Sequence, residues 1–281
     1  MKSVLVTGGT GYFGRAFVRS TLERGYERVC VFSRGEYAQH QMRIGLDDDP
    51  RLRWFIGDVR DYDRLEDAMH GVDLVVHAAA LKRIEVGHYN PIEMARTNID
   101  GTVNVVRAAK TASVRTVVYL SSDKAYQPIS AYGCSKALAE SIILAANNMY
   151  GPGGPRFAAV RYGNVWGSTG SIAPIWGDLK ARGVDYLPVT DPDCTRFFMR
   201  IGEAVDLVWR AVQSAPTDAP LVPDLPAYRV GDLAEAFGLP IEVMGLPSWE
   251  KRHECMAPCH CSEDAPRMTI DEIKEAIDAG Y

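Results

Sequence analysis

The amino-acid sequence predicts an α/β protein built on a doubly wound parallel sheet, with a smaller C-terminal lobe. Six strand-length apolar runs alternate with stretches of helical spacing through the first 165 residues. Parallel strands need helical crossovers, and because these are right-handed, helices cover both faces of the sheet. A glycine cluster between the first run and the first helical stretch is typical of sheets that bind a dinucleotide.

The first domain, residues 1–165, carries the expected sheet. We expect its strands where apolar and β-branched residues concentrate, at 3–7, 28–33, 53–57, 74–77, 116–121 and 157–162. The spacing of apolar residues predicts helices between them at 13–23, 63–69, 92–109 and 132–148.

The second domain, residues 166–281, has a different character, because glycine, proline and tryptophan are frequent as far as Pro192. Helices are predicted near 203–213, from 230 or 231 to 237, and over 269–279, where Thr-Ile-Asp-Glu offers a capped start. We expect a smaller lobe packed on the carboxyl ends of the sheet, and the prediction allows for interleaving of the two domains.

Composition excludes several classes of protein. A formal net charge of −5 over 281 residues gives no basic field for nucleic acid or an anionic membrane. No apolar run of the sequence approaches the roughly 18–20 residues of a membrane span. The chain enters its first expected strand directly after Lys2, so we expect no signal peptide and a cytoplasmic protein. Six mostly scattered cysteines fit reduced thiols better than a disulfide framework.

The glycine cluster predicts a dinucleotide site. Gly9, Gly11 and Gly14 fit G-x-G-x-x-G, and Gly8, Gly11 and Gly14 fit the looser G-x-x-G-x-x-G. In either register the glycines allow a tight turn that brings a pyrophosphate close to a helix N-terminus. The predicted cofactor contacts at this turn are Thr7, Gly8, Gly9, Gly11, Tyr12, Phe13 and Gly14.

The end of the second expected strand distinguishes NAD from NADP. A free ribose 2′-hydroxyl is usually bound there by Asp or Glu, whereas this chain has Ser33 and Arg34. A hydroxyl and a guanidinium suit a 2′-phosphate, so NADP is predicted, with a solvated surface charge as the alternative for Arg34. Further cofactor contacts are expected after the third and fourth strands, at Asp58, Val59, Ala78, Ala79 and Ala80.

A tyrosine and a lysine four residues apart form the expected catalytic pair. Tyr132 and Lys136 would lie on one face of a helix, where the lysine ammonium lowers the pKa of the phenol. The phenolate could then remove a hydroxyl proton while hydride leaves for nicotinamide, and both residues would touch the cofactor. An exposed helix pair is the alternative. Together with the glycine motif, the pair indicates a short-chain dehydrogenase/reductase.

The chain resembles the extended short-chain dehydrogenases, and within them the UDP-N-acetylglucosamine 4,6-dehydratases of the inverting type, which start pseudaminic acid synthesis. Asp123-Lys124 is the most discriminating feature, because glucose-type dehydratases usually carry Asp-Glu there and simple epimerases have neither pair. The blocks that carry the resemblance are TGGTGYFG (7–14), SRGE (33–36), GDVRD (57–61), HAAALKR (77–83), YNP (89–91), TNIDG (97–101), SSDKA (121–125), YGCSK (132–136), RYGNVWGS (161–168), LPVTDPDCTRF (187–197) and EKRHE (250–254).

The resemblance implies a mechanism for a UDP-N-acetylhexosamine. Tyr132, assisted by Lys136, would deprotonate the sugar 4-hydroxyl as NADP takes the C4 hydride, and Ser122 would hydrogen-bond the 4-oxygen. Lys124 would remove the acidified C5 proton, and protonated Asp123 would protonate the departing 6-hydroxyl. The hydride would return to C6, and the inverting type implies reprotonation of C5 from the opposite face. An exposed ion pair in a turn is the alternative for Asp123-Lys124.

The resemblance also implies the substrate contacts. Asn164 and Arg196 would meet the diphosphate, and Lys82 would approach the sugar, in each case with a surface polar group as the alternative. Thr195 belongs to the same phosphate-reaching segment as Arg196, while Glu250 and His253 match a late segment that closes the nucleotide pocket. The family's arginine in Gly-Ser-Arg-Gly is replaced here by Thr169.

Three rival functions stay open: a 4-epimerase or a 5,6-dehydratase on the same scaffold, or a non-catalytic NADP-binding protein. Cysteines 255, 259 and 261 with two nearby histidines lack the paired spacing of structural zinc sites, so we expect a reduced loop and no metal. A homodimer or a larger homo-oligomer is expected through helices 92–109 and 132–148, as in many short-chain dehydrogenases.

Overall fold

The computed structural model describes residues 1–215 and 217–280 and contains the expected doubly wound sheet. Six parallel strands lie in the order β3-β2-β1-β4-β5-β6. Their bounds are β1 Ser3–Thr7, β2 Arg28–Ser33, β3 Leu52–Ile56, β4 Leu74–His77, β5 Thr116–Leu120 and β6 Arg156–Val160. Each predicted strand of the sheet is confirmed to within two residues at either end.

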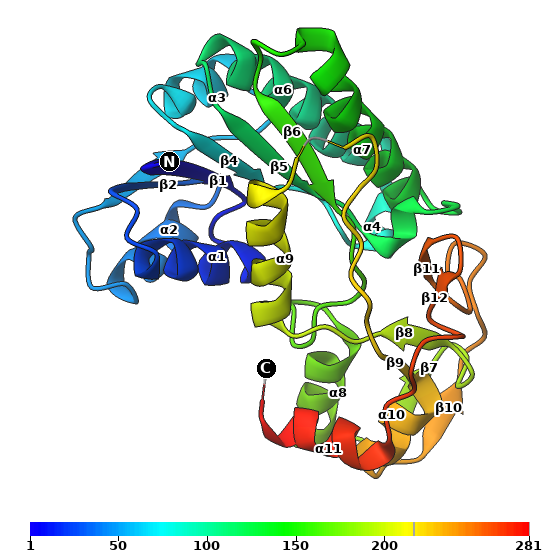
Figure 1. Ribbon diagram of the computed structural model, residues 1–281. Helices are drawn as coiled ribbons and strands as arrows, with labels where there is room; N and C mark the ends of the chain where they lie inside the picture. The colour runs from blue at the N-terminus through cyan, green and yellow to red at the C-terminus, as the bar shows by residue number, and fades with distance from the viewer. Residues whose placement is uncertain (216, 281) are drawn as a thin grey trace.

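The sheet is buried on both faces because helices cover both (Figure 1). Within β1, Val4 and Val6 face one apolar core, whereas Leu5 faces the other. This explains the continuous apolar runs, since a strand of a parallel sheet has no solvent-facing side. Helices α1, α2 and α9 lie on one side, and α3, α6 and α7 on the other. Their bounds are α1 Tyr12–Glu23, α2 Glu36–Ile44, α3 Tyr62–Met69, α6 Gly101–Thr111, α7 Ala131–Tyr150 and α9 Ile201–Gln213.

The expected helix 92–109 is continuous but not uniform. It consists of α5 Pro91–Ala95, a π-helical segment η1 Arg96–Asp100, and α6. Such π segments often mark functional sites. Within η1, the Asn98 amide bonds both backbone groups of Leu81, at 2.8 and 2.9 Å, and the Ser135 hydroxyl at 2.9 Å. The π segment therefore fixes the loop after β4 against α7.

Helices α2, α4 Ile84–Tyr89 and α8 Ile172–Ala181 were not predicted. In α2 only Gln39 and Met42 are buried, so the sequence there shows no apolar stripe. The predicted helices of the C-terminal part are confirmed as α9, α10 Val230–Phe237 and α11 Ile270–Asp278. Thr269 and Glu272 form the capping box expected at the start of α11.

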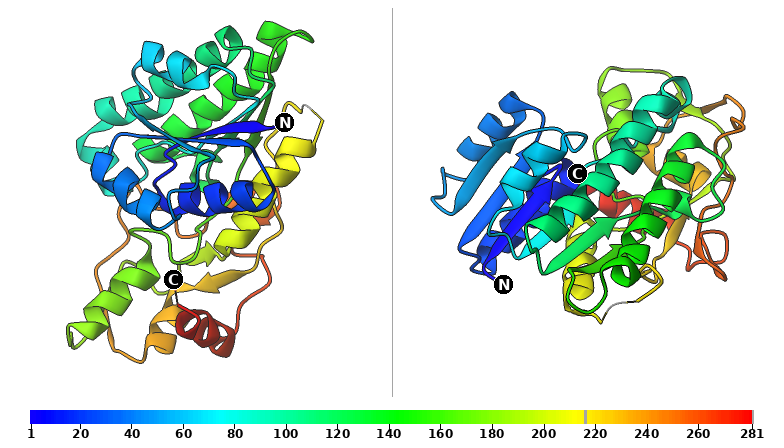
Figure 2. Two further views of the ribbon diagram at one scale, coloured as in Figure 1. Left: turned by 90° about the vertical axis from the view of Figure 1, so that its left-hand side faces the viewer. Right: turned by 90° about the horizontal axis from the view of Figure 1, so that it is seen from above.

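The C-terminal part contains three two-stranded sheets and its own apolar core. The pairs are β7 Leu187–Val189 with β10 Ile241–Val243, β8 Thr195–Phe197 with β9 Ala227–Arg229, and β11 Cys255–Ala257 with β12 His260–Cys261. Figure 1 shows this lobe beneath the arrowheads of β5 and β6, and the left view of Figure 2 shows it below the sheet. The lobe therefore lies at the carboxyl edge of the sheet.

Helix α9 returns from the lobe to the sheet. The Trp209 ring stacks on Phe17 of α1 with ring centroids 4.7 Å apart, and its indole N–H donates to Ser20 Oγ at 3.0 Å. Helix α9 thus packs against α1, and the division of the chain at residues 165 and 166 stays a prediction.

The prediction that the cysteines near residue 255 form a reduced loop is wrong, because Cys255 and Cys261 form a disulfide. The antiparallel hairpin of β11 and β12 pairs these two residues directly and brings their Cα atoms to 4.0 Å. Sequence spacing cannot reveal this register. Cys259, at the turn of the same hairpin, is a free and exposed thiol.

Candidate active site

The turn from β1 into α1 depends on its glycines. Gly8 has a φ of +67°, and a Cβ there would lie 2.9 Å from Ala79 Cα. A Cβ on Gly14 would lie 2.5 Å from the Gly8 carbonyl oxygen, and one on Gly9 would lie 2.9 Å from the Val6 carbonyl oxygen. Gly11 precedes the first turn of α1. Both registers of the motif thus describe one turn that leaves the helix N-terminus accessible.

This turn opens into a pocket of about 700 Å³ along the carboxyl edge of the sheet. The predicted cofactor residues that line the pocket are Gly8, Gly11, Tyr12, Phe13, Gly14, Ser33, Arg34, Asp58, Val59, Ala78, Ala79, Ala80, Tyr132 and Lys136. Glycines of the β1 turn and alanines of the loop after β4 line the same pocket as Tyr132. The structure therefore joins the predicted dinucleotide and catalytic residues in one cavity.

Thr7 and Gly9 do not line the pocket themselves, but they flank Gly8, which does. The Thr7 hydroxyl lies 2.7 Å from Nδ1 of buried His77 and accepts from the Ala79 amide at 3.2 Å. Burial, and then the nearby Lys136, lower the pKa of His77 to about 3. His77 is therefore a neutral bridge between Thr7 and Thr102, whose hydroxyl lies 3.1 Å from its Nε2.

The far end of the pocket carries charges of both signs. The exposed Arg34 guanidinium lies 3.8 Å from the Asp58 carboxylate, which also pairs with Arg60 at 2.7 Å. Burial raises the pKa of Asp58, but the Arg60 and Arg34 guanidinium groups hold it below its usual value. The Gln39 amide donates to Ser33 Oγ at 3.0 Å and fixes that hydroxyl. Arg34 is thus available to an anion at this end.

The loop after β5 holds the expected acid and base pair. Ser122 caps a short 3-10 turn, η2 Asp123–Ala125, and donates its hydroxyl proton to Asp123 Oδ1 at 2.8 Å. Lys124 Nζ lies 3.2 Å from the same oxygen and 3.5 Å from Asn164 Oδ1. Asp123 is buried, and Lys124 is nearly so. The pair lines the pocket, which excludes an exposed turn ion pair.

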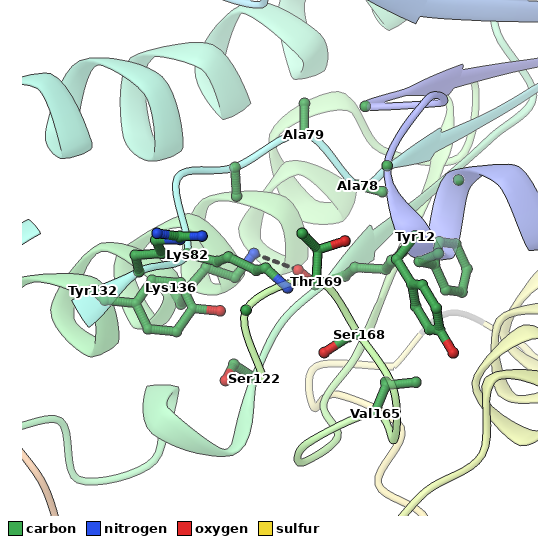
Figure 3. Close-up of a pocket in the computed structure, with 18 of the residues that line it drawn as sticks. Tyr12, Ala78, Ala79, Lys82, Ser122, Tyr132, Lys136, Val165, Ser168 and Thr169 are labelled. Carbon is green, nitrogen blue, oxygen red and sulfur yellow. Dashed lines mark hydrogen bonds between the residues drawn. The ribbon is translucent and has the colours of Figure 1, made fainter. Parts of the chain in front are cut away.

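Tyr132 lies in the first turn of α7 and meets this loop (Figure 3). A Cβ on Gly133 would lie 2.3 Å from the Lys124 carbonyl oxygen, so this glycine lets α7 press against η2. The pKa of Tyr132 lies above its ordinary value, because burial raises it more than a hydrogen bond with Ser122 and the charge of Lys124 lower it. The expected net lowering of this pKa is therefore wrong. Lys124 thus brings a positive charge close to the phenol.

Lys136 is buried one turn further along α7. Its ammonium donates to the Leu120 carbonyl oxygen and lies 4.2 Å from the centre of the Tyr119 ring. Burial lowers its pKa to about 7. Tyr132 and Lys136 both border the pocket, so they are not an exposed helix pair.

The substrate residues expected from the resemblance fall into two groups. Lys82, Asn164, Arg196 and Glu250 line the pocket. Buried Arg196 pairs with Glu250 at 2.5 Å, and burial, together with Arg83, lowers the pKa of Lys82. Thr195 and His253 bond each other at 2.9 Å and do not line the pocket, so the structure does not bring them to the site.

We compared the chain with known proteins. The family model described as "Polysaccharide biosynthesis protein" matches residues 4–273. A UDP-N-acetylglucosamine 4,6-dehydratase (inverting) of Campylobacter jejuni is 39% identical over 274 residues, covering 96% of this chain and 80% of that protein. A UDP-glucose 4-epimerase of Rickettsia prowazekii is 40% identical over 265 residues, covering 91% and 77%. The solved structure of Pen from Bacillus thuringiensis has a TM-score of 0.92 at 32% identity, covering 99% of this chain and 98% of that one.

The chain belongs to the polysaccharide biosynthesis protein family. The resemblance to extended short-chain dehydrogenases is thereby confirmed. The fold is also that of DesIV, a dTDP-glucose 4,6-dehydratase of Streptomyces venezuelae solved with NAD and TYD bound, at a TM-score of 0.84 and 21% identity. Dehydratases and epimerases therefore share this scaffold, and the site residues must distinguish them.

Several residues of this family member's site were not predicted as site residues. Glu254 contacts Lys124 at 3.1 Å, although it belongs to the segment before β11. Ser168, Thr169 and Gly170 form one wall of the pocket, so the Thr169 that departs from the family pattern faces the site. A loop without periodicity gives no sequence signal for such positions. Among residues 1–215 and 217–280, no helix is both long and apolar enough to cross a membrane.

Proposed function

We propose that this chain, a nucleotide-sugar-modifying short-chain dehydrogenase, converts UDP-N-acetylglucosamine to a UDP-4-keto-6-deoxy-N-acetylhexosamine with inversion at C5. One observation carries the proposal: Asp123 and Lys124 line the same pocket as Tyr132. Elimination of water needs one group that takes a proton from carbon and another that gives a proton to oxygen. An amine and a carboxyl group side by side supply both.

The residues divide the reaction into an oxidation and an elimination. Tyr132 first loses its own proton to solvent, and the phenolate then takes the proton of the sugar 4-hydroxyl while Ser122 holds the 4-oxygen. The ketone then acidifies the C5 proton, which Lys124 removes as Asp123 protonates the departing 6-hydroxyl. Lys124 Nζ lies 3.2 Å from Asp123 Oδ1, so the base for C5 and the acid for the hydroxyl on the adjacent, exocyclic C6 would act side by side. C5 finally regains a proton from the face opposite to the one it left, and no redox equivalent is consumed.

The pocket fits a nicotinamide dinucleotide. The tight turn, which has no room for a Cβ at Gly8 or Gly14, leads into the N-terminus of α1 at the pocket, where a pyrophosphate would bind. When bound, the nicotinamide accepts the C4 hydride and returns it to C6. Ser33 and Arg34 at the far end support NADP, because a guanidinium binds a 2′-phosphate well. Solved relatives of this fold are described with NAD, so the choice is tested by comparing the two affinities.

The opposite end of the pocket suits a UDP-sugar. Arg196 and Asn164 line it beside Lys124, where they would bind the diphosphate, and Lys82 would approach the sugar. Glu250 holds Arg196 in place. We also propose a homodimer through α6 and α7, which light scattering would test.

A 4-epimerase is the second candidate, because Rickettsia UDP-glucose 4-epimerases are as similar as the dehydratases. Proton NMR of UDP-N-acetylglucosamine incubated with the protein in deuterated water distinguishes the two. A new C6 methyl signal with deuterium at C5 supports dehydration, and the ring couplings report inversion. A galacto-configured product without a methyl group identifies an epimerase.

A further inference from the structure

A buried ion cluster connects the C-terminal lobe to the elimination residues. Lys124 Nζ lies between two carboxylates, 3.2 Å from Asp123 Oδ1 and 3.1 Å from Glu254 Oε1. Asp123 is 1% exposed and Glu254 1% exposed. Glu254 does not line the pocket, but it contacts Lys124, which does. A carboxylate buried so deeply is costly unless its charge is compensated.

Each of the two carboxyl groups has one oxygen that takes part in no hydrogen bond with the described residues. Within the described part of the chain, Asp123 Oδ2 and Glu254 Oε2 are buried and accept no hydrogen bond. Lys251 Nζ lies 3.5 Å from Glu254 Oε2, but its hydrogen bond goes to the Tyr126 carbonyl oxygen at 2.7 Å. An oxygen in this condition is well suited to gain a proton, since protonation removes a poorly solvated charge.

The lobe holds Glu254 rigidly. Its amide donates to Ser262 Oγ at 3.0 Å, and its carbonyl oxygen accepts from the Ser262 amide at 2.7 Å. Between these two residues the hairpin is closed by the disulfide of Cys255 and Cys261. The carboxylate is therefore anchored against η2 by a small covalent ring that the catalytic half of the molecule lacks.

The proposed elimination needs Lys124 as a neutral amine, but its surroundings favour the charged ammonium. Although burial lowers its pKa, Asp123 and Glu254 raise it above its ordinary value. Lys124 is therefore an ammonium before reaction, and an ammonium cannot accept the C5 proton. It must first pass one of its own protons to a neighbour. Asp123 is not that neighbour in this scheme, because it must already carry a proton on its unpartnered Oδ2 to protonate the departing hydroxyl.

We propose that Glu254 is a positioning residue that takes this proton, so that Asp123, Lys124 and Glu254 act as a triad. This inference rests on the proposed dehydration. The Lys124 N–H bond breaks as an O–H bond forms on Glu254, which leaves a neutral amine beside a neutral acid. The amine then takes the C5 proton while Asp123 gives its proton to the departing 6-hydroxyl. Solvent supplies the proton that C5 regains on its opposite face, which balances the proton that Tyr132 first lost to solvent. The Glu254 proton finally passes through Lys124 to Asp123, so the starting state is restored.

The test is the variant Glu254→Gln, which keeps the size of the side chain but cannot accept the proton. Deuterium incorporation at C5, appearance of reduced nicotinamide and KM are measured from about pH 6 to about pH 11, a range that includes the ordinary pKa of lysine. The charged and titratable groups that face the triad are Tyr132, Arg196, Tyr228, Glu250 and Lys251. Glu263→Gln, an exposed glutamate after the same hairpin, is the matched control.

We expect C5 exchange to fall by about 100-fold or more in Glu254→Gln, because general acid–base groups contribute on that scale. Reduced nicotinamide should still form and accumulate, KM should change little, and exchange should recover at high pH, where solvent deprotonates Lys124. Glu254→Asp should restore part of the rate, and Glu263→Gln should match the wild type.

Exchange in Glu254→Gln at the wild-type rate would overturn the role of Glu254 while leaving the dehydration intact. A wild-type protein that forms no methyl group contradicts the dehydration itself, and the triad with it. If Glu254→Gln does not fold, infrared difference spectra of the wild type during turnover show instead whether a glutamate becomes protonated. A carboxylic acid band that shifts on glutamate-selective ¹³C labelling supports the proposal, and its absence overturns it.

Discussion

The two halves of the pocket are built by different means. On the cofactor side, the wall contains glycines of the β1 turn and alanines of the loop after β4. Their absent or small side chains leave the space open. On the substrate side, buried charges from distant segments meet, as Arg196 does with Glu250 and Lys124 with Glu254. The first half is sensitive to added volume, whereas the second is sensitive to lost charge.

The largest effect is expected from one added methyl group on the cofactor side. Gly14→Ala places a Cβ 2.5 Å from the Gly8 carbonyl oxygen, so the turn must shift. We expect the Kd for NADP to rise by about 100-fold, since displacements near 1 Å have effects of that order. Titration calorimetry measures this. Gly202→Ala in α9 points into open space and is the control, and unchanged binding by Gly14→Ala would contradict the description of the turn.

Removal of a charge on the substrate side should weaken binding of the UDP-sugar without changing the affinity for the cofactor. Arg196→Gln removes the guanidinium that pairs with Glu250. We expect KM for the UDP-sugar to rise by about 30-fold, because a charge-assisted contact contributes roughly 2 kcal/mol. The Kd for the cofactor should not change. Arg229→Gln, at an exposed ion pair, is the control. Equal losses in both affinities would show that the halves are not independent.

The sequence predicts the first half better than the second. Strand runs, the glycine turn, Tyr132 and Asp123-Lys124 depend on neighbours within a few residues, and all appear where expected. Glu254 reaches Lys124 across 130 residues, and nothing local to either position indicates that contact. The pairing of Cys255 with Cys261 likewise depends on a hairpin register. Thr195 and His253 matched a substrate motif, yet their side chains bond each other instead of lining the pocket.

The disulfide should have a smaller effect, through the anchoring of Glu254. In the double variant Cys255→Ser with Cys261→Ser, we expect the free energy of unfolding to fall by about 2 kcal/mol, as a short closed loop predicts. Turnover should fall several-fold because Glu254 gains freedom. Denaturant unfolding and steady-state kinetics measure both quantities. Cys134→Ser, at an exposed free thiol, is the control, and full activity of the double variant would show that Ser262 alone suffices.

A pH dependence of stability is expected from Lys136. Burial lowers its pKa to about 7, so between about pH 7 and 10 the unfolded chain binds a proton that the folded protein does not. The wild type is therefore destabilised relative to Lys136→Met below pH 7, and this difference shrinks as the pH rises towards 10. Thermal melts of both proteins across that range measure it. A difference that grows with pH would mean that Lys136 is a paired cation in the folded state.

The central claim is that Tyr132 carries the oxidation whereas Lys124 carries the elimination. The most direct test is a single turnover of Lys124→Met with UDP-N-acetylglucosamine in deuterated water, followed by nicotinamide absorbance and proton NMR. The account predicts that reduced nicotinamide forms, while no deuterium enters C5 and no C6 methyl group appears. A methyl product formed at the wild-type rate would contradict it.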